Sequence, residues 1–250
     1  MASYRYERDI DPKDIAPRRQ RQYSRRERWA NWWDYNLKWV LIFGLAAAFV
    51  GYCFIGQYFF TTHADYNVAL VAPHYLPEAT QTALEQALAA YGQDLNGDGK
   101  VVVKVNVYPL DFDNEDSDAY LDMAGTTKLS TDIQGALSSI FILYDPAGFQ
   151  GTTGTLRYLD GSLPQSDADN DWWNMVYRWT DCPVLTSLDL GDYAADAVQS
   201  SSGSSQELLG HYYIGIRGAW TKDAAQLLES SQGLWDQLTA GALSTAQAEG

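Results

Sequence analysis

Cysteine and histidine are scarce in this chain, and their scarcity excludes two common kinds of structural site. Of the two cysteines among 250 residues, Cys53 lies in an apolar run and Cys182 stands alone far beyond it. The part of the chain after that run therefore has no disulfide framework. The three histidines are far apart, and none is spaced with another histidine or a cysteine as in a zinc site. Stability of that part of the chain must therefore come from packing.

The sequence also lacks the short motifs that carry common chemistry. It contains no G-x-S-x-G nucleophile turn, no H-E-x-x-H zinc motif and no glycine-rich phosphate loop. Basic residues are few, since 17 of them stand against 32 acidic residues and the net charge is −15. Such an acidic chain repels nucleic acid. The sequence therefore favours a protein that is not an enzyme, with an enzyme that lacks a recognisable motif as an alternative.

One long apolar run interrupts this polar composition. From Trp39 to Phe60 the chain has 22 residues without a charge, which as a helix cover about 33 Å and match a hydrocarbon core of about 30 Å. Tryptophan and tyrosine gather just before the run, as expected at a headgroup boundary. We predict a single transmembrane helix over 37–60, with the lipid bilayer as its partner. Its glycines and alanines offer small faces to another membrane protein, although ordinary membrane-helix composition explains them as well.

The charges on the two sides of this run differ in sign. Ten basic and six acidic residues precede it, a net charge of +4, which leaves −19 for the residues after it. By the positive-inside rule we predict a cell-membrane protein with a basic cytoplasmic segment over 1–36 and an extracytoplasmic domain over 61–245. A cleaved signal peptide is the alternative, because Thr62-His63-Ala64 loosely resembles a cleavage site.

Apolar periodicity predicts an α/β fold for the domain over 61–245. Period-two or continuous apolar runs indicate strands, and apolar residues three or four apart indicate helices. We expect strands over 65–72, 101–108, 138–144 and 211–217, and helices over 77–91, 117–135 and 221–240. The order β-α-β-α-β favours a mainly parallel sheet flanked by helices. Residues 149–206 are rich in glycine, serine and aspartate, and no element is assigned there.

A candidate calcium loop follows the first predicted helix of this domain. Asp94, Asn96 and Asp98 occupy positions one, three and five of an EF-hand-like pattern, and the Lys100 carbonyl stands at position seven. The pattern then fails, because valines stand at positions nine and twelve. A calcium ion would have to borrow a carboxylate from elsewhere. The candidates are Asp111, Asp113 and Glu115. The alternative is that the Asn-Gly and Asp-Gly pairs simply make a tight turn from helix to strand.

Ligands of open α/β sheets bind beyond the carboxyl ends of the strands. In this chain Tyr75 follows the first predicted strand and Asp145 follows the third. Trp172 and Trp173 form an aromatic pair in the unassigned region and could stack on a sugar or peptide. These four residues are a candidate ligand-binding set. Core packing is the alternative use of the tryptophans.

Several segments together resemble a known family. They are LNGDGKVVVKVNVYPLD, AGTTKLSTDIQGALSSIFILYDP and YYIGIRGAW. Their succession is similar to the amino-terminal lobe of bacterial extracellular solute-binding proteins, as carried by uncharacterised single-pass membrane-anchored ectodomains. The resemblance implies a single solute-binding lobe and noncatalytic binding of a small ligand or a protein partner. About 190 residues are too few for two lobes, so a closing clamp is not expected. A structural or accessory subunit of a membrane complex is an alternative function.

Overall fold

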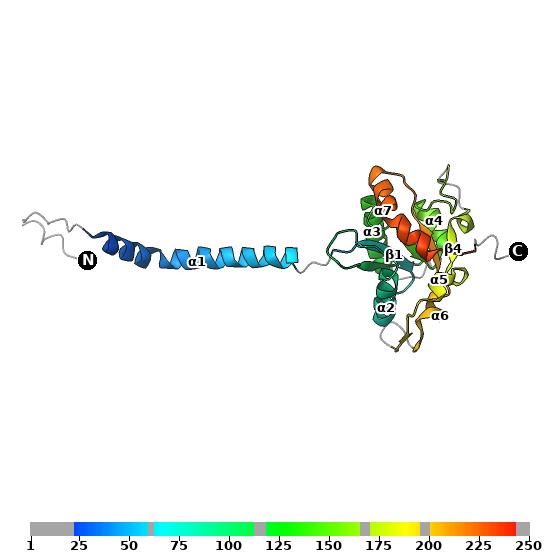
Figure 1. Cartoon of the computed structure of the whole chain (residues 1–250), viewed down its shortest axis with the longest axis horizontal. Helices are drawn as coiled ribbons and strands as arrows, with labels where there is room; N and C mark the ends of the chain where they lie inside the picture. The colour runs from blue at the N-terminus through cyan, green and yellow to red at the C-terminus, as the bar shows by residue number, and fades with distance from the viewer. Residues whose placement is uncertain (1–22, 60–62, 113–118, 166–170, 196–200, 244–250) are drawn as a thin grey trace, which may run out of the picture. The chain divides into compact units, whose positions relative to one another are not determined.

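The computed structural model describes residues 23–59, 63–112, 119–165, 171–195 and 201–243. The chain forms two compact units, 1–61 and 62–250 (Figure 1). The first contains one long helix, and the second contains a sheet with its covering helices.

The first unit is built on helix α1, Arg25–Phe59. A capping box starts it: the Ser24 N–H donates to Glu27 Oε2 at 2.9 Å, and the Glu27 N–H donates to Ser24 Oγ at 3.3 Å. The helix therefore includes the charged residues that precede the apolar run. Its 35 residues measure about 52 Å. It is long and apolar enough to cross a membrane, with none of its apolar window buried in the protein.

The second unit is organised by a five-stranded sheet in the order β2-β1-β3-β7-β4. The strands are β1 (Tyr66–Ala72), β2 (Val103–Pro109), β3 (Ile140–Leu143), β4 (Val176–Arg178) and β7 (Tyr213–Ile216). Strand β1 pairs in parallel with β2 and β3, while β7 is antiparallel to both β3 and β4. Four strands therefore run one way and β7 runs against them. The predicted α/β class with a mainly parallel sheet is confirmed.

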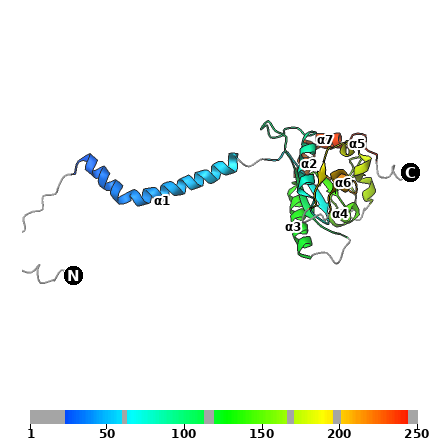
Figure 2. The same ribbon diagram turned by 90° about the horizontal axis from the view of Figure 1, so that it is seen from below.

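Helices cover both faces of this sheet (Figure 2). One face packs against α2 (Glu78–Ala89), α5 (Pro183–Thr186), α6 (Ser205–Leu209) and α7 (Lys222–Leu238). The other face packs against α3 (Ala119–Gly135) and α4 (Pro146–Thr153). Strand β1 serves both layers, since Val68 and Leu70 belong to the first core and Ala69 and Val71 to the second. Burial on both faces explains why β1 and β3 read as nearly continuous apolar runs.

Short elements fill the region that the sequence left unassigned. They are α4, α5, α6, the one-turn 3-10 helices η1 (Trp172–Asn174) and η2 (Trp179–Asp181), strand β4, and the two-residue strands β5 (Asp192–Tyr193) and β6 (Gly203–Ser204). Trp179 in η2 is fully buried and joins the core on the α7 side of the sheet. This region therefore contributes to the main core despite its polar composition.

The outer edge of the sheet is strand β2, and α2 caps the middle of that edge. The Gln81 side chain donates to the Val105 carbonyl at 2.9 Å, and the Val105 N–H donates to Glu85 Oε1 at 2.9 Å. An edge strand otherwise presents backbone groups that another strand can pair with. At Val105, the Gln81 and Glu85 side chains of α2 already bond to the carbonyl and the N–H that another strand would use.

Candidate binding groove

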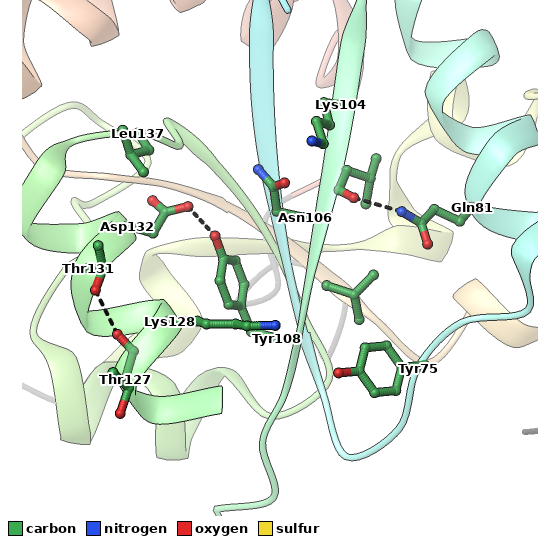
Figure 3. Close-up of a pocket in the computed structure, with 12 residues that line it drawn as sticks. Tyr75, Gln81, Lys104, Asn106, Tyr108, Thr127, Lys128, Thr131, Asp132 and Leu137 are labelled. Carbon is green, nitrogen blue, oxygen red and sulfur yellow. Dashed lines mark hydrogen bonds between the residues drawn. The ribbon is translucent and has the colours of Figure 1, made fainter. Parts of the chain in front are cut away.

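A groove lies along the edge strand, between α2 and α3. Its volume is about 530 Å³, within the range of pockets that hold small ligands. The lining residues are Tyr75, Gln81, Lys104, Val105, Asn106, Val107, Tyr108, Thr127, Lys128, Thr131, Asp132 and Leu137. Figure 3 shows the strand crossing the groove, with α3 on one side and Tyr75 and Gln81 on the other.

Strand alternation decides which side chains enter the groove from β2. Successive side chains of a strand point to opposite faces, so Lys104, Asn106 and Tyr108 share the face toward α3. Their exposure falls along the strand: Lys104 is exposed, Asn106 is partly buried and Tyr108 is buried. Helix α3 adds the exposed Lys128, whose side chain reaches across toward β2 (Figure 3). The groove between β2 and α3 thus contains two ammonium groups, one from each element, and the side-chain amide of Asn106.

A buried polar cluster lies beneath this face. Asp132 is 1% exposed, and its Oδ2 accepts hydrogen bonds from the Tyr108 hydroxyl at 2.5 Å and the Ser138 hydroxyl at 2.6 Å. Its Oδ1 accepts the Ser138 backbone N–H at 2.9 Å. Burial, with the bond to Asp132, raises the pKa of Tyr108 well above its ordinary value, so the phenol stays protonated as a donor. The cluster ties β2 to the end of α3.

Arg217 supplies the opposite charge to this cluster. It is 3% exposed, and its guanidinium donates to the carbonyls of Ser138 and Ile133, both at 2.9 Å. Burial lowers the pKa of Arg217, and the negative charge of Asp132 opposes that shift. Because the two oxygens of Asp132 already accept three hydrogen bonds, this carboxylate holds the groove floor in place and is not a free base.

The exposed side chains of the groove carry positive charge, although the domain as a whole is acidic. After Thr62 the chain has four lysines, Lys100, Lys104, Lys128 and Lys222, within a net charge of −19. Two of the four line the groove. The groove carboxylate Asp132 is buried, so the charges that face solvent there are both positive. An anion is the ligand that such a site attracts.

The structure separates the four residues that the sequence suggested for ligand binding. Tyr75 is 44% exposed and lines the groove. Asp145 instead caps α4, where its Oδ1 accepts the Gly148 N–H at 3.0 Å. Trp172 packs its ring edge-on against Tyr213 of β7, with the ring centroids 5.7 Å apart, and Trp173 stands beside it at 6.1 Å. The groove lining includes only Tyr75 of this set.

The two groove lysines, Lys104 and Lys128, are not among the residues that the sequence suggested for ligand binding. The available signal was the alternation of polar and apolar residues in VKVNVYP, which places Lys104 and Asn106 on one face of a strand with an open edge. The partner helix contributes Lys128 from a segment with weak periodicity. No sequence pattern connects the two lysines, because only the parallel crossover brings α3 beside β2.

The candidate calcium loop forms a tight turn whose side chains bond to its own backbone. Asp94 accepts the N–H groups of Gly97 and Gly99 at 2.6 and 2.8 Å. The Asn96 side-chain oxygen accepts the Asp98 backbone N–H at 2.8 Å, and the Asp98 carboxylate accepts the Lys100 backbone N–H at 2.9 Å. Both glycines have positive φ, 75° and 84°, which glycine adopts without strain.

The structure brings one further carboxylate, that of Asp65, beside this loop. Among the residues that the structure describes, no three acidic, histidine or cysteine side chains gather as a metal-binding group. Asp65 is close, but its carboxylate accepts the N–H groups of Leu95, Asn96 and Val102. Asp113 and Glu115 lie outside the described residues. Calcium binding at Asp94, Asn96, Asp98 and Lys100 therefore stays a prediction, with the self-bonded turn as the account that the hydrogen bonds support.

Replacing Asp94 by alanine tests the turn against the metal site. We expect the free energy of unfolding to fall by about 1 kcal/mol, because two backbone N–H groups lose their acceptor at an exposed position. The loss should be equal with a chelator and with millimolar calcium, as measured by urea unfolding of the full chain in detergent. A wild-type protein that calcium stabilises, and an Asp94→Ala variant that it does not, would establish the metal site instead.

Comparisons with known proteins identify no relative. No protein-family model matches the chain, and no curated protein or solved structure is significantly similar to it.

Proposed function

We propose that this protein is a single-pass membrane protein whose α/β domain lies outside the cytoplasm and binds a small anionic ligand without catalysis. Helix α1 would be the membrane anchor, and the groove along β2 would be the binding site. The proposal also takes the domain to be a single solute-binding-like lobe. The observation that carries it is the pair of lysines, Lys104 and Lys128, in a groove of an otherwise acidic domain.

Length and charge support the membrane anchor. Helix α1 is long and apolar enough to cross a membrane, and its apolar window is not buried in the protein. The net charge is +4 before the apolar run and −19 after it. Basic residues stay on the cytoplasmic side of a short first span, which orients the α/β domain outward.

The chemistry of the groove supports binding of an anion. Ammonium groups of Lys104 and Lys128 attract carboxylates or phosphates, and the side-chain amide of Asn106 adds a hydrogen-bond donor at the same surface. Tyr75 adds an exposed aromatic ring at the opposite wall. The buried cluster around Asp132 joins β2 to α3, so the backbone positions from which the two lysines extend are set before a ligand arrives.

The test is ligand-induced stabilisation of the full chain in detergent, with citrate, inorganic phosphate and a hexa-aspartate peptide as probes. A probe at about 100 times its Kd stabilises the folded state by about 2.7 kcal/mol, which raises Tm by about 5–10 °C in a domain of this size. We expect at least one probe to do so, less strongly at high salt. If none of the three shifts Tm, the proposed function is wrong.

A matched pair of variants locates the binding. The double variant Lys104→Ala/Lys128→Ala should weaken binding of the active probe about thirtyfold, from about 1 kcal/mol for each charge-assisted contact. Lys100→Ala/Lys222→Ala removes the same charge from the other two lysines of the domain and should leave the Kd within about twofold. Equal losses in both variants would mean that net charge, and not the groove, attracts the probe.

A further inference from the structure

In the N-terminal part of α1, Arg25–Lys38, one face is aromatic with Arg25 and Asn36 at its two ends, and the opposite face is polar. Trp29, Trp32 and Trp33 are spaced by three and four residues, so they lie on one side of the helix. They are 70%, 50% and 46% exposed, and neighbouring rings have centroids 6.0 Å apart. Polar residues occupy the other side. They are Glu27, Asn31, Asp34 and Lys38. Three exposed tryptophans on one face need an apolar neighbour.

A straight helix cannot give this aromatic face a membrane neighbour. The 21 residues from Trp39 to Phe59 cover about 31 Å, the whole hydrocarbon core. Trp29 lies ten residues before Trp39, about 15 Å farther along the axis, whereas the headgroup layer is only about 5–8 Å thick on each side. If α1 continued straight, Trp29 would stand in water beyond the headgroups.

The structure shows that α1 is not straight. Its N-terminal part turns away from the axis of the rest of the helix (Figure 2). A local cause is present, because the Asn36 side-chain amide donates to the Trp32 carbonyl at 2.8 Å, the carbonyl that the Asn36 backbone N–H would use alone in a regular helix. A polar side chain that enters the backbone ladder in this way can bend a helix. This hydrogen bond joins the end of the aromatic face to a residue just before the apolar span.

We propose that Arg25–Lys38 lies in the plane of the inner membrane surface, with Trp29, Trp32 and Trp33 at the boundary between headgroups and acyl chains. Arg25, Arg26 and Arg28 would contact anionic lipid headgroups, for which their charge is complementary. The polar face with Asp34 and Lys38 would face the cytoplasm. Tryptophan and basic residues on a helix of this kind are typical of interfacial helices. The inference rests on membrane insertion of α1, which belongs to the proposed function.

The experiment uses spin labels on the full chain in nanodiscs of phosphatidylcholine and phosphatidylglycerol. Cys53 is exposed and is replaced by serine, whereas Cys182 is buried, and burial raises the pKa of its thiol to about 12, so it does not react. Cysteine then replaces Trp32, Trp33, Asn31, Asp34 or Val50, one position at a time. The accessibility of each label to oxygen and to a water-soluble nickel complex is measured.

We expect labels at 32 and 33 to favour oxygen and labels at 31 and 34 to favour the nickel complex. The label at position 50 reports on the span alone: if it is water-accessible, the membrane anchor itself is wrong. If position 50 lies in lipid while all four upstream labels are equally water-accessible, only the surface helix is wrong. Dipolar broadening between labels at position 33 would show that a second copy covers the tryptophans, and it would also overturn the inference.

Charge provides a second, independent readout. The triple variant Arg25→Gln/Arg26→Gln/Arg28→Gln should weaken the surface association about fivefold for each arginine in nanodiscs with phosphatidylglycerol, seen as a gain of nickel accessibility at position 33. In nanodiscs of phosphatidylcholine alone, the variant and the parent should differ little. An equal effect in both lipids would contradict recognition of anionic headgroups.

Discussion

Replacing Asp132 by alanine is expected to lower the free energy of unfolding by about 3–5 kcal/mol. The substitution removes the acceptor of the Tyr108 and Ser138 hydroxyls and of the Ser138 N–H. It also leaves the buried guanidinium of Arg217 without the negative charge that opposes its desolvation. Urea unfolding of the full chain in detergent, followed by near-UV circular dichroism, measures the change.

Two variants separate the charge from the packing at this position. Thr131→Ala changes the neighbouring residue, which is exposed and donates to the Thr127 carbonyl within α3, and it should cost under about 0.5 kcal/mol. Asp132→Asn keeps the side-chain volume but loses the charge, so its cost should fall between those of the other two. A loss below about 1 kcal/mol for Asp132→Ala would show that the cluster does not hold the groove floor.

Trp179→Ala is expected to destabilise the α/β domain by about 3–5 kcal/mol. The side chain is fully buried beside the sheet, so its removal leaves a large cavity. Its indole N–H donates to Gln206 Oε1 at 3.1 Å, and the Gln206 amide in turn donates to the carbonyls of Leu185 and Leu188 at 2.9 and 2.7 Å. The substitution therefore also loosens the segment that follows η2.

Trp173 is the matched control for this substitution. It lies in the same region but is 44% exposed, so Trp173→Ala should cost under about 1 kcal/mol in urea unfolding. Similar losses for the two variants would mean that Trp179 does not anchor the short elements to the core. If Trp173→Ala weakened binding of an anionic probe, the aromatic pair would belong to the binding site as well.

The regular elements of the domain could be predicted because burial pattern and chain length agree there. The expected strands over 65–72 and 138–144 contain β1 and β3, and the expected helix over 221–240 contains α7. A short continuous apolar run fits a buried strand, whereas apolar residues at helical spacing over several turns fit only a helix. The strand order was not predicted, since periodicity says nothing about which strands pair.

The short elements could not be predicted, because they are too short to show a burial pattern. Strand β4 has three residues and takes its form from antiparallel pairing with β7, in which Val176 lies opposite Gly215, 39 residues later in the sequence. A run of three residues contains no period to detect. One signal was overlooked, because Asp145 followed by Pro146 is an N-cap and first-turn pair, and it would have placed the start of α4. For α1, the capping box at Ser24 and Glu27 likewise marked the true start.

The candidate site was predicted only in part. Tyr75 was expected from its place after β1 and does line the groove. Lys104 and Lys128 belong to a strand and a helix that were both predicted, but their proximity depends on the crossover between β2 and β3. Asp145 serves its own helix as a cap. Residues at strand ends can therefore be predicted from local sequence, whereas the groove forms only when the crossover brings α3 beside β2.

Gln81 and Glu85 bond to β2 at the edge where a second copy of the domain could pair with the sheet. Domains tethered to one surface meet one another at high local concentration, and bare edge strands would then join neighbouring copies into continuous sheets. Because α2 already satisfies the backbone groups of Val105, a strand that paired along the middle of β2 would have to break two internal hydrogen bonds. In the membrane-tethered protein proposed above, these two side chains would oppose the joining of neighbouring copies through the edge that borders the lysine-lined groove.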